Sequence, residues 1–145
     1  MTGVVLVAVN DSEQAFAAAQ VAVEYARALG ARLRAVAVVE PWEPSGALRD
    51  ADPALLARAR EHSAAAALRH VAAVGAAADV EVAGVTRRGH VGAVILAEAD
   101  AVNATLIVMA RVSRPGHALP YVGSQTLRVL EFAAVPVLVV PTRAW

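Results

Sequence analysis

The stretch VVLVAVNDSEQAF, residues 4–16, sets the architecture of the chain. Its first six residues are apolar and mostly β-branched, which is typical of a strand buried on both faces of a sheet. Asp11 follows where a helix N-cap is expected, and Gln14 stands three residues later, as in a capping box. Apolar residues then recur at helical spacing until Gly30, which is expected to end the helix. The stretch therefore predicts a buried strand that leads into a helix.

The same alternation of strand and helix repeats to the end of the chain. Four further strands are expected at residues 33–40, 80–86, 105–110 and 136–140, and three further helices at residues 52–74, 91–102 and 124–132. Five apolar strands that alternate with four helices indicate an α/β fold, in which a parallel sheet is covered on both faces. We therefore expect one doubly wound, Rossmann-like domain with a five-stranded parallel sheet, spanning residues 1–145.

The composition excludes several classes of protein. Thirteen basic residues balance thirteen acidic ones, so no surface suited to nucleic acid is expected. The absence of cysteine excludes disulfides and thiol catalysis, and the absence of lysine excludes a Walker A loop. The N-terminal apolar run is only six residues long, so neither a signal peptide nor a membrane span is expected. The chain is therefore expected to be cytoplasmic, without membrane contact.

Other catalytic and metal sites are also disfavoured. The turn after the first strand lacks the glycines of a dinucleotide fingerprint, and no GxSxG nucleophile elbow occurs. The four histidines have no chelating spacing, and His62 and His70 are expected to be solvated on a helix. Glu98 and Asp100 are likewise expected on a solvated helix face. With no evident base or pair of magnesium ligands, the protein is not expected to be an enzyme, and a slow ATPase is the least favoured function.

The long connection after the fourth strand is the first candidate for a binding site. Ligands of doubly wound sheets bind beyond the carboxyl ends of the strands, and long loops there are often functional. Gly123 and Ser124 stand where the last helix begins, so free backbone N–H groups could bind an anion, with Arg111 or Arg114 adding a guanidinium. The alternative is that Gly123 turns the chain, Ser124 caps the helix and the arginines are solvated.

Four segments carry a family resemblance: VLVAVNDSEQA, a strand ending VVEP, GHVGAVILAEADAVNATLIVMA and GSQTLRVLEFAAVPVLVV. With them the whole chain resembles the universal stress protein family. The resemblance implies a site for ATP or another adenine nucleotide, with or without magnesium, and a regulatory role in the stress response. The nucleotide-binding residues that we expect from the loop and from the resemblance together are Asn10, Ser12, Val38, Val39, Ala110, Arg111, Ser113, Arg114, Gly123, Ser124 and Gln125.

The chain departs from the nucleotide-binding pattern of that family at three of these positions. The family loop carries glycine, two residues, glycine, nine residues, then glycine and serine or threonine. The last pair matches Gly123 and Ser124, whereas Ala110 and Ser113 replace the two earlier glycines, and Asn10 replaces the usual aspartate. Lost backbone freedom at a glycine costs about 1–3 kcal/mol where φ is strained. Binding is therefore expected to be weak or altered, and a nucleotide-independent dimeric interaction module is the alternative.

The last strand is expected to form a dimer interface. It is apolar on both sides, and as an edge strand it would expose unpaired backbone groups. Family members commonly dimerise through this strand, so the resemblance implies a homodimer through Pro136, Val137, Leu138, Val139 and Val140. The alternative is an edge shielded by Pro136, Pro141 and the C-terminal tail. A further protein partner is left open.

Overall fold

The computed structural model describes residues 3–41, 52–111 and 123–141. Within these residues the elements follow in the order β1 (Val4–Val9), α1 (Glu13–Leu29), β2 (Arg32–Val39), α2 (Pro53–Ala77), β3 (Val82–Arg88), α3 (Val91–Ala101), β4 (Leu106–Ala110), α4 (Ser124–Phe132) and β5 (Val137–Val140). All neighbouring strands run parallel, in the order β3-β2-β1-β4-β5. The five-stranded, doubly wound α/β fold expected from the sequence is confirmed.

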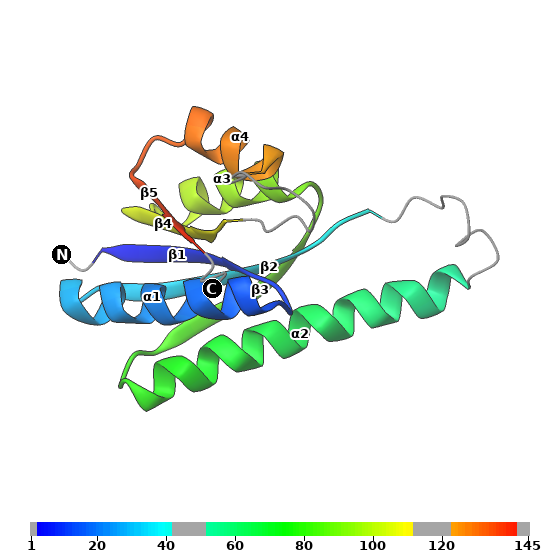
Figure 1. The fold of residues 1–145 in the computed structure, drawn as a ribbon, viewed down its shortest axis with the longest axis horizontal. Helices are drawn as coiled ribbons and strands as arrows, with labels where there is room; N and C mark the ends of the chain where they lie inside the picture. The colour runs from blue at the N-terminus through cyan, green and yellow to red at the C-terminus, as the bar shows by residue number, and fades with distance from the viewer. Residues whose placement is uncertain (1–2, 42–51, 112–122, 142–145) are drawn as a thin grey trace.

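The sheet forms the middle layer of the molecule, with a pair of helices on each face. Figure 1 shows α1 and α2 on one side of the sheet and α3 and α4 on the other. Alternate residues of the central strand serve the two cores: Val5 and Val7 pack toward α1 and α2, and Leu6 packs toward α3 and α4. All three are fully buried, as the uniformly apolar strand predicts.

The N-cap of the first helix is one residue later in the sequence than expected. Asp11 was the expected N-cap, but the N-cap is Ser12, whose extended backbone leaves its Oγ free to accept from the N–H of Ala15 at 3.2 Å. Asp11 is exposed. The helix ends at Gly30, as expected, with a left-handed φ of 64° that glycine adopts without strain.

The edge strand β3 is displaced from its expected position. The apolar run predicted residues 80–86, whereas β3 spans Val82–Arg88 and pairs along its length with β2, from Leu33↔Val82 to Val39↔Arg88. The expected strand ends at Thr86, before Arg87 and Arg88. They continue it because the ladder with β2 runs to Val39 and an edge strand can carry charged side chains.

His70 on α2 is not solvated, contrary to expectation. Its ring packs against Phe16 of α1 with 4.0 Å between ring centroids, and its buried Nε2 has no hydrogen-bond partner among the residues that the structure describes. His62 is exposed, as expected. The difference arises because His70 faces the contact between α1 and α2, which the sequence of one helix does not reveal.

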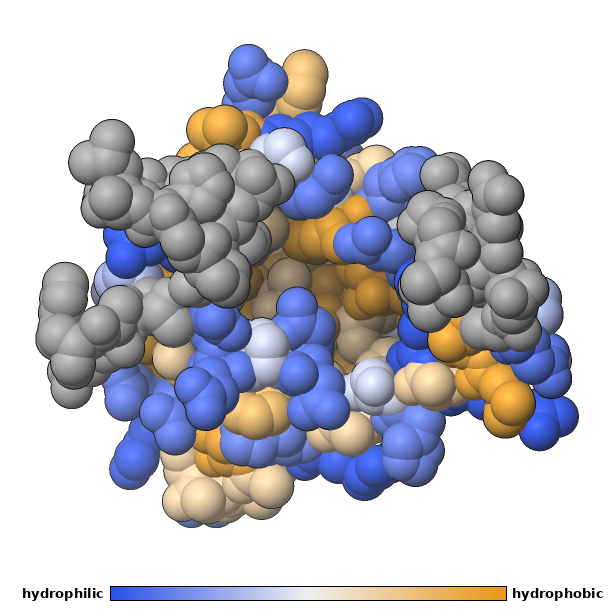
Figure 2. Space-filling model, turned by 45° about the vertical axis from the view of Figure 1, so that its right-hand side comes forward, coloured by the Kyte–Doolittle hydropathy of each residue, from blue (hydrophilic) through white to orange (hydrophobic). Residues whose placement is uncertain are grey.

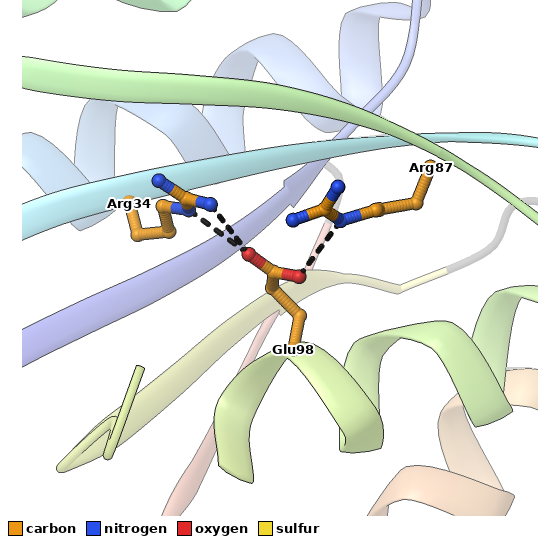
Figure 3. Close-up of polar contacts among 3 residues, drawn as sticks. All are labelled: Arg34, Arg87 and Glu98. Carbon is orange, nitrogen blue, oxygen red and sulfur yellow. Dashed lines mark hydrogen bonds and ion pairs between the residues drawn. The ribbon is translucent and has the colours of Figure 1, made fainter. Parts of the chain in front are cut away.

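Glu98 on α3 is also buried, and the expectation of a solvated side chain is wrong. Its carboxylate bridges two strands, as Figure 3 shows: Oε1 accepts from Arg34 Nε at 3.0 Å and Nη2 at 2.8 Å, and Oε2 accepts from Arg87 Nε at 3.1 Å. Burial alone would raise the pKa of Glu98, but the hydrogen bonds and charges of Arg87 and Arg34 outweigh it and lower that pKa. Glu98 therefore fastens α3 to the β2–β3 side of the sheet.

No helix in the described part of the chain is long and apolar enough to cross a membrane.

Candidate functional site

A cavity of about 380 Å³ opens at the carboxyl edge of the sheet. It lies where the strand order reverses, because β2 and β4 flank β1 on opposite sides, and this is the usual ligand position in doubly wound folds. Figure 2 turns the right-hand side of Figure 1 toward the viewer and shows a hollow with a largely hydrophobic floor. The described residues that line the cavity are Ala8, Val9, Asn10, Ser12, Gln14, Ala15, Val38, Glu40, Val91, Met109, Ala110, Arg111, Gln125 and Thr126.

Asn10 and Ser12 form the polar corner after β1. The Ser12 hydroxyl donates to Asn10 Oδ1 and accepts from the N–H of Ala15, so one serine links the corner to the start of α1. The Asn10 carbonyl oxygen is thereby engaged, and its amide group retains two N–H donors. An aspartate here could accept from Ser12 with one oxygen and still offer a second acceptor to a ligand. Asn10 therefore gives the cavity donor character and no negative charge.

The end of β4 supplies the floor of the cavity. Ala110 is the last residue of the strand and pairs with Val140 of β5, and the Arg111 N–H continues the ladder by donating to the Val140 carbonyl at 2.8 Å. Ala110 is not among the residues with positive φ. The backbone strain expected where alanine replaces the glycine of the family pattern is therefore absent at this position. The methyl group still occupies part of the cavity wall. Arg111 is partly buried and lines the cavity beside it.

The start of α4 brings backbone donors to the same edge. Gly123 has φ 96° and ψ 145°, a combination that side chains rarely tolerate, and no side chain of the described residues caps the helix. Ser124 is therefore not the N-cap but the first helical residue, and it is exposed. The N–H groups of the first turn have no acceptor within the helix, and the helix dipole favours an anion there. Gln125 and Thr126 place this turn on the cavity.

Gln125 also joins α4 to α3. Its Oε1 accepts from the N–H of Gly92 at 2.9 Å, which satisfies a free donor in the first turn of α3. Gly92 permits this approach, since a Cβ there would lie 3.0 Å from Gln125 Oε1 and 3.1 Å from Arg128 Cδ. The two helix starts are thus held together beside the cavity, with Val91 in its wall.

The structure gathers most of the residues expected in the nucleotide site. Six of them line the cavity, namely Asn10, Ser12, Val38, Ala110, Arg111 and Gln125. Gly123 and Ser124 adjoin it in sequence but are not among its described lining residues, and Ser113 and Arg114 lie outside the described residues.

Val39 does not line this cavity but an adjoining one, which shares Val9, Asn10, Val38 and Glu40 with it. It is buried on the α1–α2 face and lines a second cavity of about 420 Å³ between α2 and the end of β2. Arg60 of α2 also lines that cavity and donates from Nη1 to the Glu40 carbonyl at 2.9 Å. The alternation of side chains along β2 puts Val38 on the opposite face from Val39, so Val38 lines both cavities and Val39 only the second.

Sequence reasoning missed several lining residues. Met109 precedes Ala110 in β4, and Val91 and Thr126 come from the first turns of α3 and α4. The rule that helix starts meet strand ends in a parallel sheet would have identified Val91. Thr126 is 2% exposed. It is the third residue of α4, and the sequence reasoning included only the first two residues of that helix, Ser124 and Gln125.

Comparisons with known proteins agree with this geometry. The model of the universal stress protein family matches residues 1–141. A solved protein of that family from Burkholderia pseudomallei is 26% identical, with a TM-score of 0.76 over 97% of this chain and 96% of its own. The universal stress protein from Archaeoglobus fulgidus in complex with dAMP is 19% identical, with a TM-score of 0.70 over 97% of this chain and 98% of its own.

A universal stress protein in complex with cAMP is 23% identical, with a TM-score of 0.75 over the same shares of the two chains, 97% and 98%. No curated protein shows a significant sequence match.

Proposed function

The chain belongs to the universal stress protein family, and on that premise we propose that it binds an adenine nucleotide weakly at the carboxyl-edge cavity. Binding, and not catalysis, is the proposed activity, in a regulatory role in the stress response. Among the described residues that line the cavity, Glu40 is the only carboxylate. One carboxylate provides neither a pair of magnesium ligands nor a separate base for activating water.

The observation that carries this proposal is the meeting of a cavity with the uncapped start of α4. The cavity of about 380 Å³ has the size of a small-ligand site, and its wall includes the Arg111 side chain. A phosphate at the start of α4 would meet free N–H groups and a favourable dipole, with Arg111 as a charge-assisted donor. Two relatives with the same fold were solved with dAMP and with cAMP, which favours an adenine nucleotide as the ligand.

Two features of the cavity favour weak binding. The Asn10 carbonyl oxygen already accepts from Ser12, so Asn10 offers a ribose hydroxyl only the second lone pair of a neutral oxygen, where an aspartate would offer a further, charged oxygen. Ala110 lines the cavity where the family pattern has glycine, so a methyl group stands where glycine would have none. Replacing a charged hydrogen-bond acceptor by a neutral group costs about 1 kcal/mol or more, which weakens binding about tenfold.

Asn10→Asp is expected to strengthen binding of AMP or ATP about tenfold. The new carboxylate would keep the contact with Ser12 and add a charged acceptor for a ribose hydroxyl. Isothermal titration of the two proteins with AMP and ATP measures the change, and Asp11→Asn, which removes an exposed charge from the neighbouring residue, serves as the control. Equal or weaker binding by Asn10→Asp would place the sugar away from this corner.

A nucleotide-independent interaction module is the second candidate. It is favoured by the engagement of cavity side chains with the protein itself, Asn10 with Ser12 and Gln125 with Gly92. In that case neither AMP nor ATP at millimolar concentration would release heat or raise the melting temperature. Saturable heat in the same titration would exclude this candidate.

We further propose that two copies associate through the outer edge of β5. The Ile107 N–H donates to Pro136 and the Arg111 N–H to Val140, so residues 136, 138 and 140 face β4 and the backbone of Val137 and Val139 faces outward. Val137, Leu138 and Val139 are only partly buried. Pairing with a second β5 would satisfy the outward groups and cover these side chains.

Val139→Pro tests this dimer without touching the pairing of β5 with β4. Proline removes an N–H that points away from the sheet, which edge strands tolerate. The wild-type chain is expected to sediment as a dimer at micromolar concentration and the variant to dissociate, with an unchanged circular dichroism spectrum. A monomeric wild-type chain, or a variant that stays fully dimeric, would contradict the proposal.

A further inference from the structure

The opposite edge of the sheet, β3, is long and unpaired. No strand among the described residues pairs with its outer side, and it is seven residues in length. Ala83, Gly84 and Thr86 are exposed along it. An open edge of this kind is a template for pairing with another strand, and proteins usually shorten or cover it.

The outward backbone groups of β3 can be assigned. The Gly89 N–H donates to the Val39 carbonyl of β2 at 3.1 Å, so the backbone groups of the odd-numbered residues point toward β2. Because direction alternates along a strand, the N–H and C=O groups of Val82, Gly84 and Thr86 point outward. Three alternate residues with outward backbone groups are enough to form a regular antiparallel ladder with a second strand.

The charges on the α3-facing side of β3 are not balanced. Arg34 and Arg87 share the single carboxylate of Glu98, which leaves one positive charge in excess, and the Arg87 side chain is 48% exposed. In Figure 3 the two Nη atoms of Arg87 carry no contact to Glu98. A second carboxylate beside Arg87 would therefore balance the group.

Such a carboxylate, Glu81, immediately precedes the first residue of β3. Val80 and Val82 pack in the core beneath α1 and α2, so the alternation of β3, extended by one residue, assigns Glu81 to the opposite face, the one that carries Arg87. Glu81 is exposed. One face of the edge thus begins with a negative charge and ends with a positive one, a self-complementary arrangement for two antiparallel copies.

We infer that two copies of this chain pair antiparallel through β3, about a two-fold axis at Gly84. In this register Gly84 lies opposite the partner's Gly84 in a hydrogen-bonded pair, and Glu81 lies opposite the partner's Arg87 in a closer, non-hydrogen-bonded pair. The two-fold axis makes this ion pair form twice. Shifting the register by two residues in either direction places Glu81 opposite Val85 or Gly89, so the charges select one register.

The helix layer fits this pairing. α2 packs against both β2 and β3, and strands in a sheet lie about 4.8 Å apart, so the two copies of α2 would lie about 10 Å from each other. That is the usual distance between packed helices. The exposed residues near the end of α2 include Ala72, Ala73 and Ala76, whose small side chains permit close approach.

The association is expected to be weak and independent of nucleotide. One pair of strands with a helix contact covers less area than the roughly 1,200 Å² of stable interfaces, which indicates affinities in the micromolar range or weaker. The β3 edge shares no lining residue with the carboxyl-edge cavity. Pairing at β3 therefore does not depend on nucleotide binding or on pairing at β5, and a negative result for either of those would not test it.

Sedimentation of variants in the Val139→Pro background isolates this contact. Here we expect concentration-dependent dimers at high micromolar protein, and Glu81→Arg should weaken them about tenfold or more because it places two arginines opposite each other. Glu24→Arg, the same charge change on the exposed side of α1, is the control. Thr86→Pro, which removes an outward N–H only, should also abolish the dimer. A monomeric background at every concentration, or equal effects of the two arginine variants, would overturn the inference.

A disulfide cross-link tests the register in a chain that keeps Val139 and can therefore still pair through β5. The chain contains no cysteine, so Ala83→Cys combined with Val85→Cys introduces the only thiols, each opposite the other in the partner. Mild oxidation should give a covalent dimer that reductant dissolves, whereas Ala83→Cys alone should cross-link far less. Equal cross-linking by the single and double variants would refute this register.

Discussion

Glu98→Gln is expected to lower the free energy of unfolding by about 2–3 kcal/mol. The substitution removes the charge that two guanidinium groups share and leaves Arg34 and Arg87 facing each other across a neutral amide. Loss of one partner from a fully buried ion pair costs about 3–5 kcal/mol, and the effect here is smaller because the arginine side chains are 25% and 48% exposed. Chemical denaturation measures it, and the melting temperature should fall by about 5–10 °C.

Asp100→Asn, two residues further along α3, is the matched control. Asp100 is exposed, and neutralising it should change stability by no more than about 0.5 kcal/mol. If Glu98→Gln proves as mild as Asp100→Asn, the bridge between α3 and the β2–β3 side does not hold the two layers together.

The same bridge predicts how stability depends on pH. Because the pKa of Glu98 in the folded chain lies below its ordinary value of 4.5, the unfolded chain binds the proton more readily. The contribution of Glu98 is therefore fully present above pH 4.5 and is lost as pH falls through the lower folded pKa. The wild-type protein should lose stability more steeply than Glu98→Gln in that acidic range, and parallel curves would contradict the assignment.

Gly123→Ala is expected to cost about 1–3 kcal/mol in stability and to weaken nucleotide binding at least tenfold. The backbone at φ 96° and ψ 145° aims the first turn of α4, and a Cβ would be strained in that conformation. The strain is relieved most easily by turning the start of α4, which moves its free N–H groups away from the phosphate position. Titration calorimetry with ATP, alongside denaturation, measures both effects.

Gly30→Ala separates strain from binding. Gly30 also has a positive φ, 64°, and within the described part of the chain no heavy atom beyond its own neighbours lies within 4 Å of an added Cβ. It ends α1 at the amino side of the sheet, away from the cavity. Gly30→Ala should therefore destabilise the protein without weakening ATP binding. An equal loss of affinity in both variants would mean that stability alone controls binding.

Much of the fold could be predicted because the parallel sheet is buried on both faces. Runs such as Val4–Val9 are apolar without interruption, and the helices between them are bounded by glycine, proline and capping residues. The prediction failed where a residue's role depends on distant partners. The strand expected to end at Thr86 continues through Arg87 and Arg88, because β2 supplies the ladder.

The candidate site could be predicted only in outline. Its position follows from the strand order, and Asn10 and Arg111 follow from their place just after β1 and β4. The link between Gln125 and Gly92 spans 33 residues, and the bridge from Arg34 to Glu98 spans 64, so no local pattern announces either. By contrast, the hydrogen bond from the Ser12 hydroxyl to the Asn10 oxygen spans only two residues, so this part of the site lay within reach of local sequence reasoning.

The central claim is that the first turn of α4 and the adjoining cavity bind the phosphate and base of an adenine nucleotide. Amide nuclear magnetic resonance of the labelled chain, titrated with ATP, AMP and adenosine, tests it residue by residue. We expect saturable shifts at Ser124, Gln125 and Thr126 with ATP and AMP but not with adenosine, and shifts at Asn10 and Val38 with all three. Unmoved α4 amides at millimolar ATP would contradict the claim.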